Sequence, residues 1–365
     1  MSGYSWEQFD FVLLGLVAAL VIFGVVVIYS AIAGNVVLAG LVKRQIIYAI
    51  IGFAVLIITA LIDYHYWASF SKYLYIATFG LLAILGVVGK AVYGSARWID
   101  IGAFFIQPSE IAKIVTILVL ADFFSKHRHQ IHQLRWVAIS FLLTMGLVGW
   151  ILIQPDLSTS ITILVIWFGM LWATGLTWKH LALFGIIGAI APFVAWPFLA
   201  DYQKARVINF LFPNPNARHG AIYNVQQALI SLGSGGLFGE GYRHGTQVQL
   251  RFLKVRHTDF IFSVIGEEFG FVGAVTVLIL LLLVIWRILR IARTAHDTTG
   301  ALIAYGVAVM LFFHMAVNVA MNINLIPVTG LPLPFITYGG SALLSSLLGI
   351  GLVESVAMRR KPFIF

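Results

Sequence analysis

The sequence predicts an all-α polytopic membrane protein with about ten transmembrane helices. Of the 365 residues, 61% are hydrophobic and only 10% are charged, and the mean hydropathy is +0.97. Soluble domains are roughly 25% charged. A chain of this length holds on the order of ten spans of about 20 residues with modest loops. We therefore expect residues 1–365 to form one transmembrane domain, with a long loop at 199–259 inside it.

The expected spans are the apolar runs between polar breaks. The first run begins beside the acidic residues Glu7 and Asp10 and has no basic segment before it, so we expect a retained span rather than a cleavable signal peptide. The runs, in order, are 9–31, 46–62, 70–90, 108–125, 136–154, 159–175, 180–198, 260–286, 301–323 and 336–357.

The orientation follows from basic residues in the short loops, because cytoplasmic loops carry the excess of Lys and Arg. An even number of spans puts both termini on one side. With both ends cytoplasmic, the inner side holds eleven basic residues: Lys72, Lys126, Arg128, Arg135, Lys179, Arg287, Arg290, Arg293, Arg359, Arg360 and Lys361. The short outer loops hold four: Lys43, Arg44, Lys90 and Arg97. Both termini are predicted to be cytoplasmic and the 199–259 loop extracytoplasmic.

The long loop is basic and has an organisation of its own. It contains a turn at 213–216, a helix-sized stretch at 221–232 and a glycine-rich loop from Gly233 to Gly245. About sixty residues is long for a connector, which favours a lid or substrate-facing element over a mere linker. Its seven basic residues against three acids indicate an anionic partner: Lys204, Arg206, Arg218, Arg243, Arg251, Lys254 and Arg256 against Asp201, Glu240 and Asp259.

Composition also excludes several classes of protein. The chain has no Cys, so it has no disulfide framework, thiolate metal site or cysteine nucleophile. The net charge of +9 does not indicate nucleic-acid binding, because the cytoplasmic loops and anionic lipid headgroups account for much of it. The two halves show no convincing repeat, so an inverted-repeat transporter is not supported.

Ionisable residues at the spans are costly unless they are paired or face water, so each marks a candidate site. Glu110 and Lys113 are three residues apart and share one helix face, as a structural ion pair or as part of a site. Asp156, in a tight outer turn, either begins the next helix or faces a ligand. Glu267 and Glu268 are expected to be structural, with at least one facing protein.

Asp259 is the strongest candidate for chemistry. It is the carboxylate between the basic loop and the eighth run, in the segment Arg256-His257-Thr258-Asp259-Phe260. It could be only the N-cap of that helix. A carboxylate at the outer membrane surface beside basic groups is also a candidate general base.

The segment 327–335 holds three prolines within eight residues and cannot form an ordinary helix. We expect a re-entrant or outer loop that packs in protein and helps to wall a cavity. The following Gly339-Gly340-Ser341 lacks the lysine and spacing of a phosphate-binding P-loop, so a nucleotide site is rejected.

These motifs together resemble the SEDS family (shape, elongation, division and sporulation). The resemblance runs in order from near residue 90 to the C-terminus, and the proline-rich segment is closer to the RodA branch than to FtsW. Ser158 and Thr337 stand where the family usually has Gly and Ser. The motifs are Arg97-Trp98-Ile99, Gln107-Pro108-Ser109-Glu110 with Lys113, Gln154-Pro155-Asp156-Leu157, Tyr202-Gln203 with Arg206, His257-Thr258-Asp259-Phe260-Ile261-Phe262, and Pro332-Leu333-Pro334 with Tyr338-Gly339-Gly340-Ser341.

The resemblance implies a peptidoglycan glycosyltransferase of the bacterial cytoplasmic membrane, with its active site on the extracytoplasmic face. It would polymerise lipid II into β-1,4 glycan strands during cell-wall elongation and release undecaprenyl pyrophosphate. Its implied partners are lipid II, the nascent strand, membrane lipids and a class B penicillin-binding protein. A lipid II flippase and a mere scaffold for that protein are the alternatives, but a flippase needs a polar path across the bilayer, whereas the unusual residues lie toward one face.

The resemblance also suggests roles for residues. Asp259 would be the catalytic base, and Arg97, Lys113 and Arg206 would meet the pyrophosphate, although Lys113 could instead tune Asp259 while Glu110 fixes Lys113. No cofactor is firmly implied, but a divalent cation, Mg²⁺ or Mn²⁺, bridging Asp259 and pyrophosphate is a hypothesis. The full set of expected substrate-binding residues is Arg97, Glu110, Lys113, Asp156, Arg206, His257 and Thr258.

Overall fold

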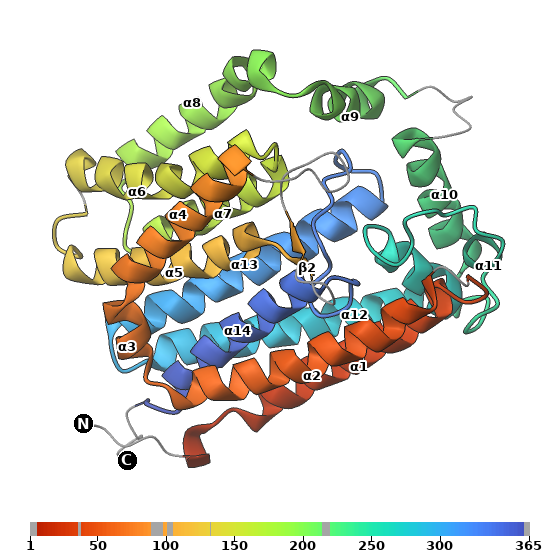
Figure 1. Ribbon diagram of the computed structural model, residues 1–365, viewed down its shortest axis with the longest axis horizontal. Coiled ribbons are helices and arrows are strands. Elements are labelled where there is room, and N and C mark those ends of the chain that lie inside the picture. The colour runs from red at the N-terminus through yellow and green to blue at the C-terminus, as the bar shows by residue number, and fades with distance from the viewer. Residues whose placement is uncertain are drawn as a thin grey trace.

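The computed structural model is a bundle of long helices, most of which lie side by side along one direction (Figure 1). It describes residues 6–35, 38–88, 98–100, 105–131, 133–213 and 220–360. The ten long helices of this part coincide with the ten predicted runs. They are α1 (Phe11–Ala31), α2 (Gly40–Leu61), α4 (Ser71–Val88), α5 (Pro108–Lys126), α6 (Leu134–Ile153), α7 (Leu157–Ala173), α8 (Trp178–Ala195), α12 (Ile261–Thr294), α13 (Thr298–Asn322) and α14 (Gly340–Ala357).

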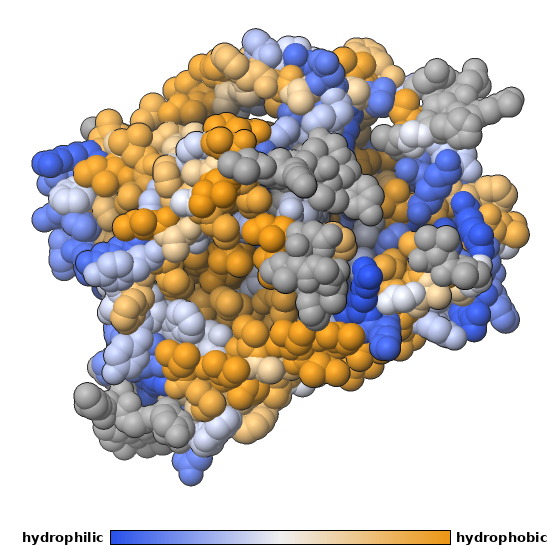
Figure 2. Space-filling model, viewed as in Figure 1, coloured by the Kyte–Doolittle hydropathy of each residue, from blue (hydrophilic) through white to orange (hydrophobic). Residues whose placement is uncertain are grey.

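The polytopic all-α class is confirmed, but the number of ten spans stays a prediction. Among the described residues, seven helices are long and apolar enough to cross a membrane, namely α1, α2, α6, α8, α12, α13 and α14. Apolar residues cover the middle of the molecule, and hydrophilic residues gather at its two ends (Figure 2). This is the surface that a bilayer requires.

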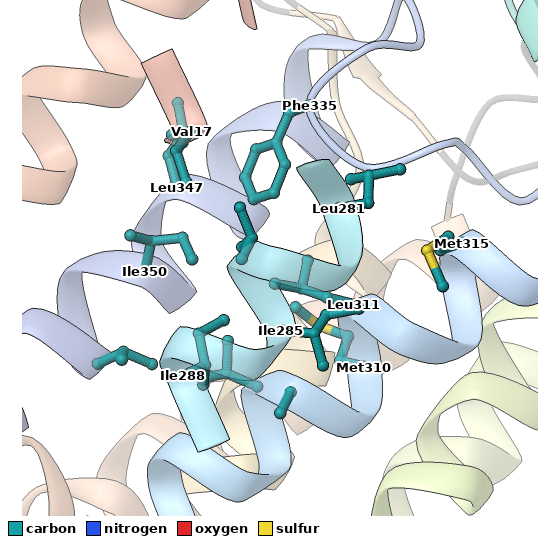
Figure 3. Close-up of a cluster of buried hydrophobic side chains, with 14 of the residues drawn as sticks. Val17, Leu281, Ile285, Ile288, Met310, Leu311, Met315, Phe335, Leu347 and Ile350 are labelled. Atoms are coloured by element: carbon teal, nitrogen blue, oxygen red, sulfur yellow. The ribbon is translucent and has the colours of Figure 1, made fainter. Parts of the chain in front are cut away.

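The core lies where α12, α13 and α14 meet α1 and α2. Figure 3 shows buried Leu281, Ile285 and Ile288 of α12 against Leu311 of α13 and Ile350 of α14. By contrast, most side chains of α8 are exposed, and α8 with the following α9 (Asp201–Leu211) lies along one edge of the bundle (Figure 1).

The two ends of the described chain lie on the same side. The Arg360 guanidinium donates to the Gln8 carbonyl oxygen at 2.9 Å, and the Asp10 backbone N–H donates to the Glu354 carboxylate at 2.9 Å. Since α14 begins near Gly340 and ends beside these residues, its N-terminal end lies at the opposite end of the bundle.

The long loop folds into short helices rather than an open chain. The helix predicted at 221–232 is confirmed as α10 (Ala221–Ser234), and α9 and α11 (Thr246–Gln249) flank it. Most of the predicted turn at 213–216 lies outside the described residues. Arg218 also lies outside them. The sequence did not predict the short helix α3 (Tyr64–Ser69), the antiparallel pair β1 (Ile99–Asp100) and β2 (Phe105–Ile106), or the extension of α12 to Thr294.

Candidate functional site

A cavity of about 510 Å³ opens at the end of the bundle opposite the described chain ends. The N-terminal ends of α5, α7 and α14 meet there, and helix N-termini carry partial positive charge that suits an anionic ligand. α9 and the proline-rich segment close the sides, as predicted for that segment. The cavity is lined by Trp98, Gln107, Glu110, Pro155, Asp156, Leu157, Ser158, Thr159, Ile161, Tyr202, Gln203, Arg206, Val207, Thr258, Asp259, Pro327–Pro332, Thr337–Gly339 and Ala342.

Asp259 lies on the cavity wall, directly before α12. Its backbone carbonyl accepts hydrogen bonds from Asn318 Nδ2 at 3.3 Å and Asn322 Nδ2 at 3.0 Å. The N-cap of α12 is Phe260, so Asp259 does not cap the helix. Within the described chain its carboxylate has no hydrogen-bond or ion-pair partner. Its backbone is thus fixed while its carboxylate is free to meet a ligand.

Arg206 is the charged group that acts on Asp259. It comes from α9, and its Nη1 donates to the carbonyl oxygens of Val328 at 3.2 Å and Thr329 at 3.4 Å. Burial raises the pKa of Asp259, and the Arg206 guanidinium lowers it by a smaller amount. The long loop therefore supplies both a carboxylate and a cation to the same cavity.

Glu110 and Lys113 form the predicted ion pair, with Lys113 Nζ 2.8 Å from Glu110 Oε2. Glu110 lines the cavity, whereas Lys113 is fully buried beneath the wall and does not line it. Ser345 of α14 donates to Glu110 Oε2 at 2.8 Å, and Lys113 Nζ lies 3.3 Å from Nε2 of His314 on α13. The pair thus joins three helices.

Asp156 combines both interpretations of its position. It caps α7 by accepting from the Thr159 backbone N–H at 3.2 Å, and it lines the cavity. Its Oδ2 also accepts from Gln107 Nε2 at 2.9 Å. The Gln107 backbone N–H donates to Ser341 Oγ at 3.0 Å, which links the first turns of α5, α7 and α14.

The remaining predicted residues differ in position. Thr258 lines the cavity, but His257 does not; its backbone carbonyl accepts from the Tyr338 N–H at 3.1 Å. Burial first, and then the Arg256 charge, lower the pKa of His257. Arg97 lies outside the described residues. Glu267 and Glu268 are buried and face protein, as predicted: Glu267 accepts from the Gln247 N–H at 2.6 Å and Glu268 from the Ser30 hydroxyl.

Sequence reasoning missed three residues of α13 that support the site. His314, Asn318 and Asn322 are buried and contact Lys113, Asp259 and the proline-rich segment. The missed signal is their spacing of four, which places three polar side chains on one face of an apolar span.

The fold and cavity define a polytopic helical membrane protein with a cavity lined by charged residues at one end of the bundle. The sequence model of one protein family, the FtsW, RodA and SpoVE cell cycle proteins, matches residues 11–362. The chain therefore belongs to this family.

Curated relatives cover almost the whole chain. The peptidoglycan glycosyltransferase MrdB of Escherichia coli K12 is 37% identical over 359 residues, which is 98% of this chain and 96% of MrdB. A probable peptidoglycan glycosyltransferase FtsW of Geobacter sp. M18 is 34% identical, covering 97% of this chain and 98% of its own length. Stage V sporulation protein E of Bacillus subtilis is 35% identical over 86% of both chains.

Solved structures agree with this assignment. A chain from a peptidoglycan synthase complex that coordinates polymerization and crosslinking has a TM-score of 0.84 at 32% identity, covering 97% of this chain and 99% of its own. The crystal structure of the rod shape determining protein RodA of Thermus thermophilus has a TM-score of 0.72 at 32% identity, covering 98% and 99%.

Proposed function

We propose that this chain is a peptidoglycan glycosyltransferase that polymerises lipid II into β-1,4 glycan strands and releases undecaprenyl pyrophosphate. The names of its relatives support the activity. The observation that carries the proposal is Asp259, a carboxylate without a partner in the described chain, on the wall of a cavity that Arg206 also lines. Such a pair suits a reaction that removes a proton and releases an anion.

Each group has a role in an inverting displacement. The 4-hydroxyl of the acceptor N-acetylglucosamine attacks C1 of the donor N-acetylmuramic acid, and its proton passes to the Asp259 carboxylate. The C1–O4 bond forms as the bond from C1 to the pyrophosphate oxygen breaks. Arg206 stabilises the negative charge that develops on the leaving pyrophosphate. The raised pKa of Asp259 makes it a stronger base than an ordinary carboxylate.

The glycosyltransferase works, in this proposal, at the extracytoplasmic face, with both termini in the cytoplasm. The positive-inside count supports this orientation, and the cavity lies at the end of the bundle opposite the described chain ends. The apolar surface between the helices gives the polyprenyl chains a place while the head groups enter the cavity.

The proposed partner is a class B penicillin-binding protein, with which the chain acts in cell-wall elongation. The resemblance of the proline-rich segment to RodA supports elongation. The match to a complex of polymerization and crosslinking supports an assembly with a transpeptidase.

A divalent cation is a further part of the proposal. Mg²⁺ and Mn²⁺ prefer carboxylate and phosphate oxygens, and the free carboxylate of Asp259 fits such an ion. No cluster of three or more His, Asp or Glu side chains that could hold a metal occurs among the described residues. Asp259 would therefore hold the ion together with the substrate's pyrophosphate. Loss of activity in chelator without rescue by either ion would count against it.

The test is polymerisation of labelled lipid II by the purified chain, with and without its penicillin-binding partner. We expect glycan chains from the wild type and none from Asp259→Asn, which keeps size but removes the base. Asp201→Asn, an exposed residue of α9 outside the cavity, is the matched control and keeps activity. Equal product from Asp259→Asn and wild type, with both folded, would remove Asp259 from the chemistry. No product from the wild type would favour transport or scaffolding.

A further inference from the structure

Beneath the cavity wall, a buried chain of polar groups runs from α14 through α5 to α13. Ser345 donates to Glu110, Glu110 accepts from Lys113, and Lys113 meets His314. Lys113 is 0% exposed and His314 is 1% exposed, so water does not compete for these contacts. Only Glu110 of this chain of groups reaches the cavity.

The donor and the acceptor can be assigned in the hydrogen bond between Lys113 and His314. An ammonium group carries only donors, so Nζ donates and His314 Nε2 accepts. His314 is therefore neutral, with its proton on Nδ1, because a protonated imidazole would offer Lys113 only a second donor and a like charge. Nδ1 has no partner in the described structure.

The ammonium needs this acceptor because it has three donors in a dry site. Nζ lies 2.9 Å from Oε1 and 2.8 Å from Oε2 of Glu110, and 3.3 Å from His314 Nε2. The Glu110 carboxylate compensates the positive charge of Lys113. The imidazole accepts the hydrogen bond from the N–H that points toward α13. A buried charged group that leaves one N–H without an acceptor costs free energy. Without His314, the ammonium would therefore move to find another acceptor, and this movement would take it away from Glu110.

We propose that His314 is a positioning residue for the transferase site, which acts by aiming the Lys113 ammonium at Glu110. This inference rests on the proposed function. Glu110 is a carboxylate on the wall of a cavity that must accept a pyrophosphate. With Lys113 held against it, its negative charge is compensated; with Lys113 displaced, the wall repels the substrate.

The test compares two substitutions that differ in the acceptor. His314→Gln places an amide oxygen near the position of Nε2, and His314→Leu removes the acceptor with similar bulk. In lipid II polymerisation we expect about a tenfold or greater loss of kcat/KM for His314→Leu, carried mainly by KM, and less than about a threefold loss for His314→Gln. Met315→Leu, the next buried residue on α13, controls for packing and keeps wild-type kinetics.

A second background separates positioning from general destabilisation. In Lys113→Met, adding His314→Leu costs no more activity, because the group it positions is gone. Thermal unfolding of each variant shows which ones fold. Equal losses for His314→Gln and His314→Leu, full activity of His314→Leu, or additive losses in the double variant would each overturn the inference. If the wild type polymerises and Asp259→Asn does not, any of these results rejects the role of His314 alone; an inactive wild type rejects the proposed function instead.

Discussion

At the scale of single residues, the candidate site separates the groups that hold position from the carboxylate that is proposed to react. Asn318 and Asn322 hold the Asp259 carbonyl, while its carboxylate faces the cavity with no partner in the described chain. Buried polar groups are ordinarily paired. A carboxylate left unpaired beside fixed neighbours is the arrangement expected where substrate supplies the missing partner.

The pH dependence of activity follows from the environment of Asp259. A general base must be ionised, and burial raises the pKa of Asp259 while Arg206 lowers it. Removing the guanidinium charge with Arg206→Gln takes away the lowering influence, so the pKa of Asp259 rises further. The acid limb of kcat/KM for polymerisation is therefore expected to move to higher pH.

The matched control for this prediction is Arg243→Gln. Arg243 is an exposed arginine of the same loop that lies over the Tyr29 ring and does not line the cavity. It is expected to leave the acid limb in place. An unmoved limb in Arg206→Gln, or a shift toward lower pH, would contradict the assignment of Asp259 as the group whose ionisation controls the rate.

Sequence reasoning identified the residues whose neighbours are close in the chain. Glu110 and Lys113 could be paired because they lie three positions apart on one helix, and the structure shows that ion pair. The family resemblance placed Arg206 and Asp259 at the same substrate, but their spacing in the chain could not, because the approach depends on how α9 packs over the proline-rich segment. The same limit applies to His314, whose contact with Lys113 joins residues 201 positions apart.

At the scale of elements, backbone hydrogen bonds join the glycine-rich loop to α12. α12 is interrupted at Gly270, where φ is 68° and ψ is −166°. The break leaves some backbone groups of the helix without partners inside the helix, and the loop provides hydrogen-bond partners for them. Phe271 N–H donates to the Gly236 carbonyl at 2.9 Å, and Glu240 N–H donates to the Glu267 carbonyl at 2.9 Å. The loop that precedes Asp259 is thereby anchored on the helix that follows it.

Gly270→Ala should detach this loop. A Cβ at residue 270 would lie 2.3 Å from the Gly239 backbone N and 2.6 Å from the Leu237 carbonyl oxygen, and the positive φ adds strain. We expect a loss of about 2 kcal/mol or more in the free energy of unfolding. The readouts are a lower Tm and faster proteolysis within 235–245.

Gly149→Ala is the control for that substitution, because Gly149 lies inside α6 and a Cβ there meets nothing within 4 Å. It should leave the Tm unchanged or raise it slightly. A Gly270→Ala protein with wild-type Tm and wild-type cleavage would show that the loop does not depend on the break in α12.

Element boundaries were predicted less well than element existence. Hydropathy located the ten runs, but α2 begins at Gly40 rather than 46, and α12 continues to Thr294 through Arg287, Arg290 and Arg293. Polar residues at a membrane surface look like the end of a span, yet a helix continues as long as its backbone can bond internally. The pair β1 and β2 has two residues in each strand, too short for any alternating pattern to reveal.

At the scale of the whole molecule, charges tie the helices together at the end opposite the cavity. Arg287 of α12 donates to both oxygens of Asp10 at 2.6 and 2.7 Å, and the Asp10 N–H donates to Glu354 of α14. The molecule thus has two polar ends with an apolar surface between them (Figure 2). One polar end holds the two termini of the described chain, and the other holds the cavity. We expect the end that holds the chain ends to face the cytoplasm.

The absence of Cys from the chain makes that orientation directly measurable. His129 is exposed between α5 and α6, and Asp201 is exposed at the start of α9, so single cysteines at these positions sit at opposite ends of the bundle. With the positive-inside orientation, a membrane-impermeant maleimide labels Asp201→Cys in right-side-out spheroplasts and labels His129→Cys only after the membrane is opened. Activity of both variants controls for folding. Labelling of His129→Cys in closed spheroplasts, with Asp201→Cys protected, would place the cavity in the cytoplasm and exclude polymerisation on the outer face.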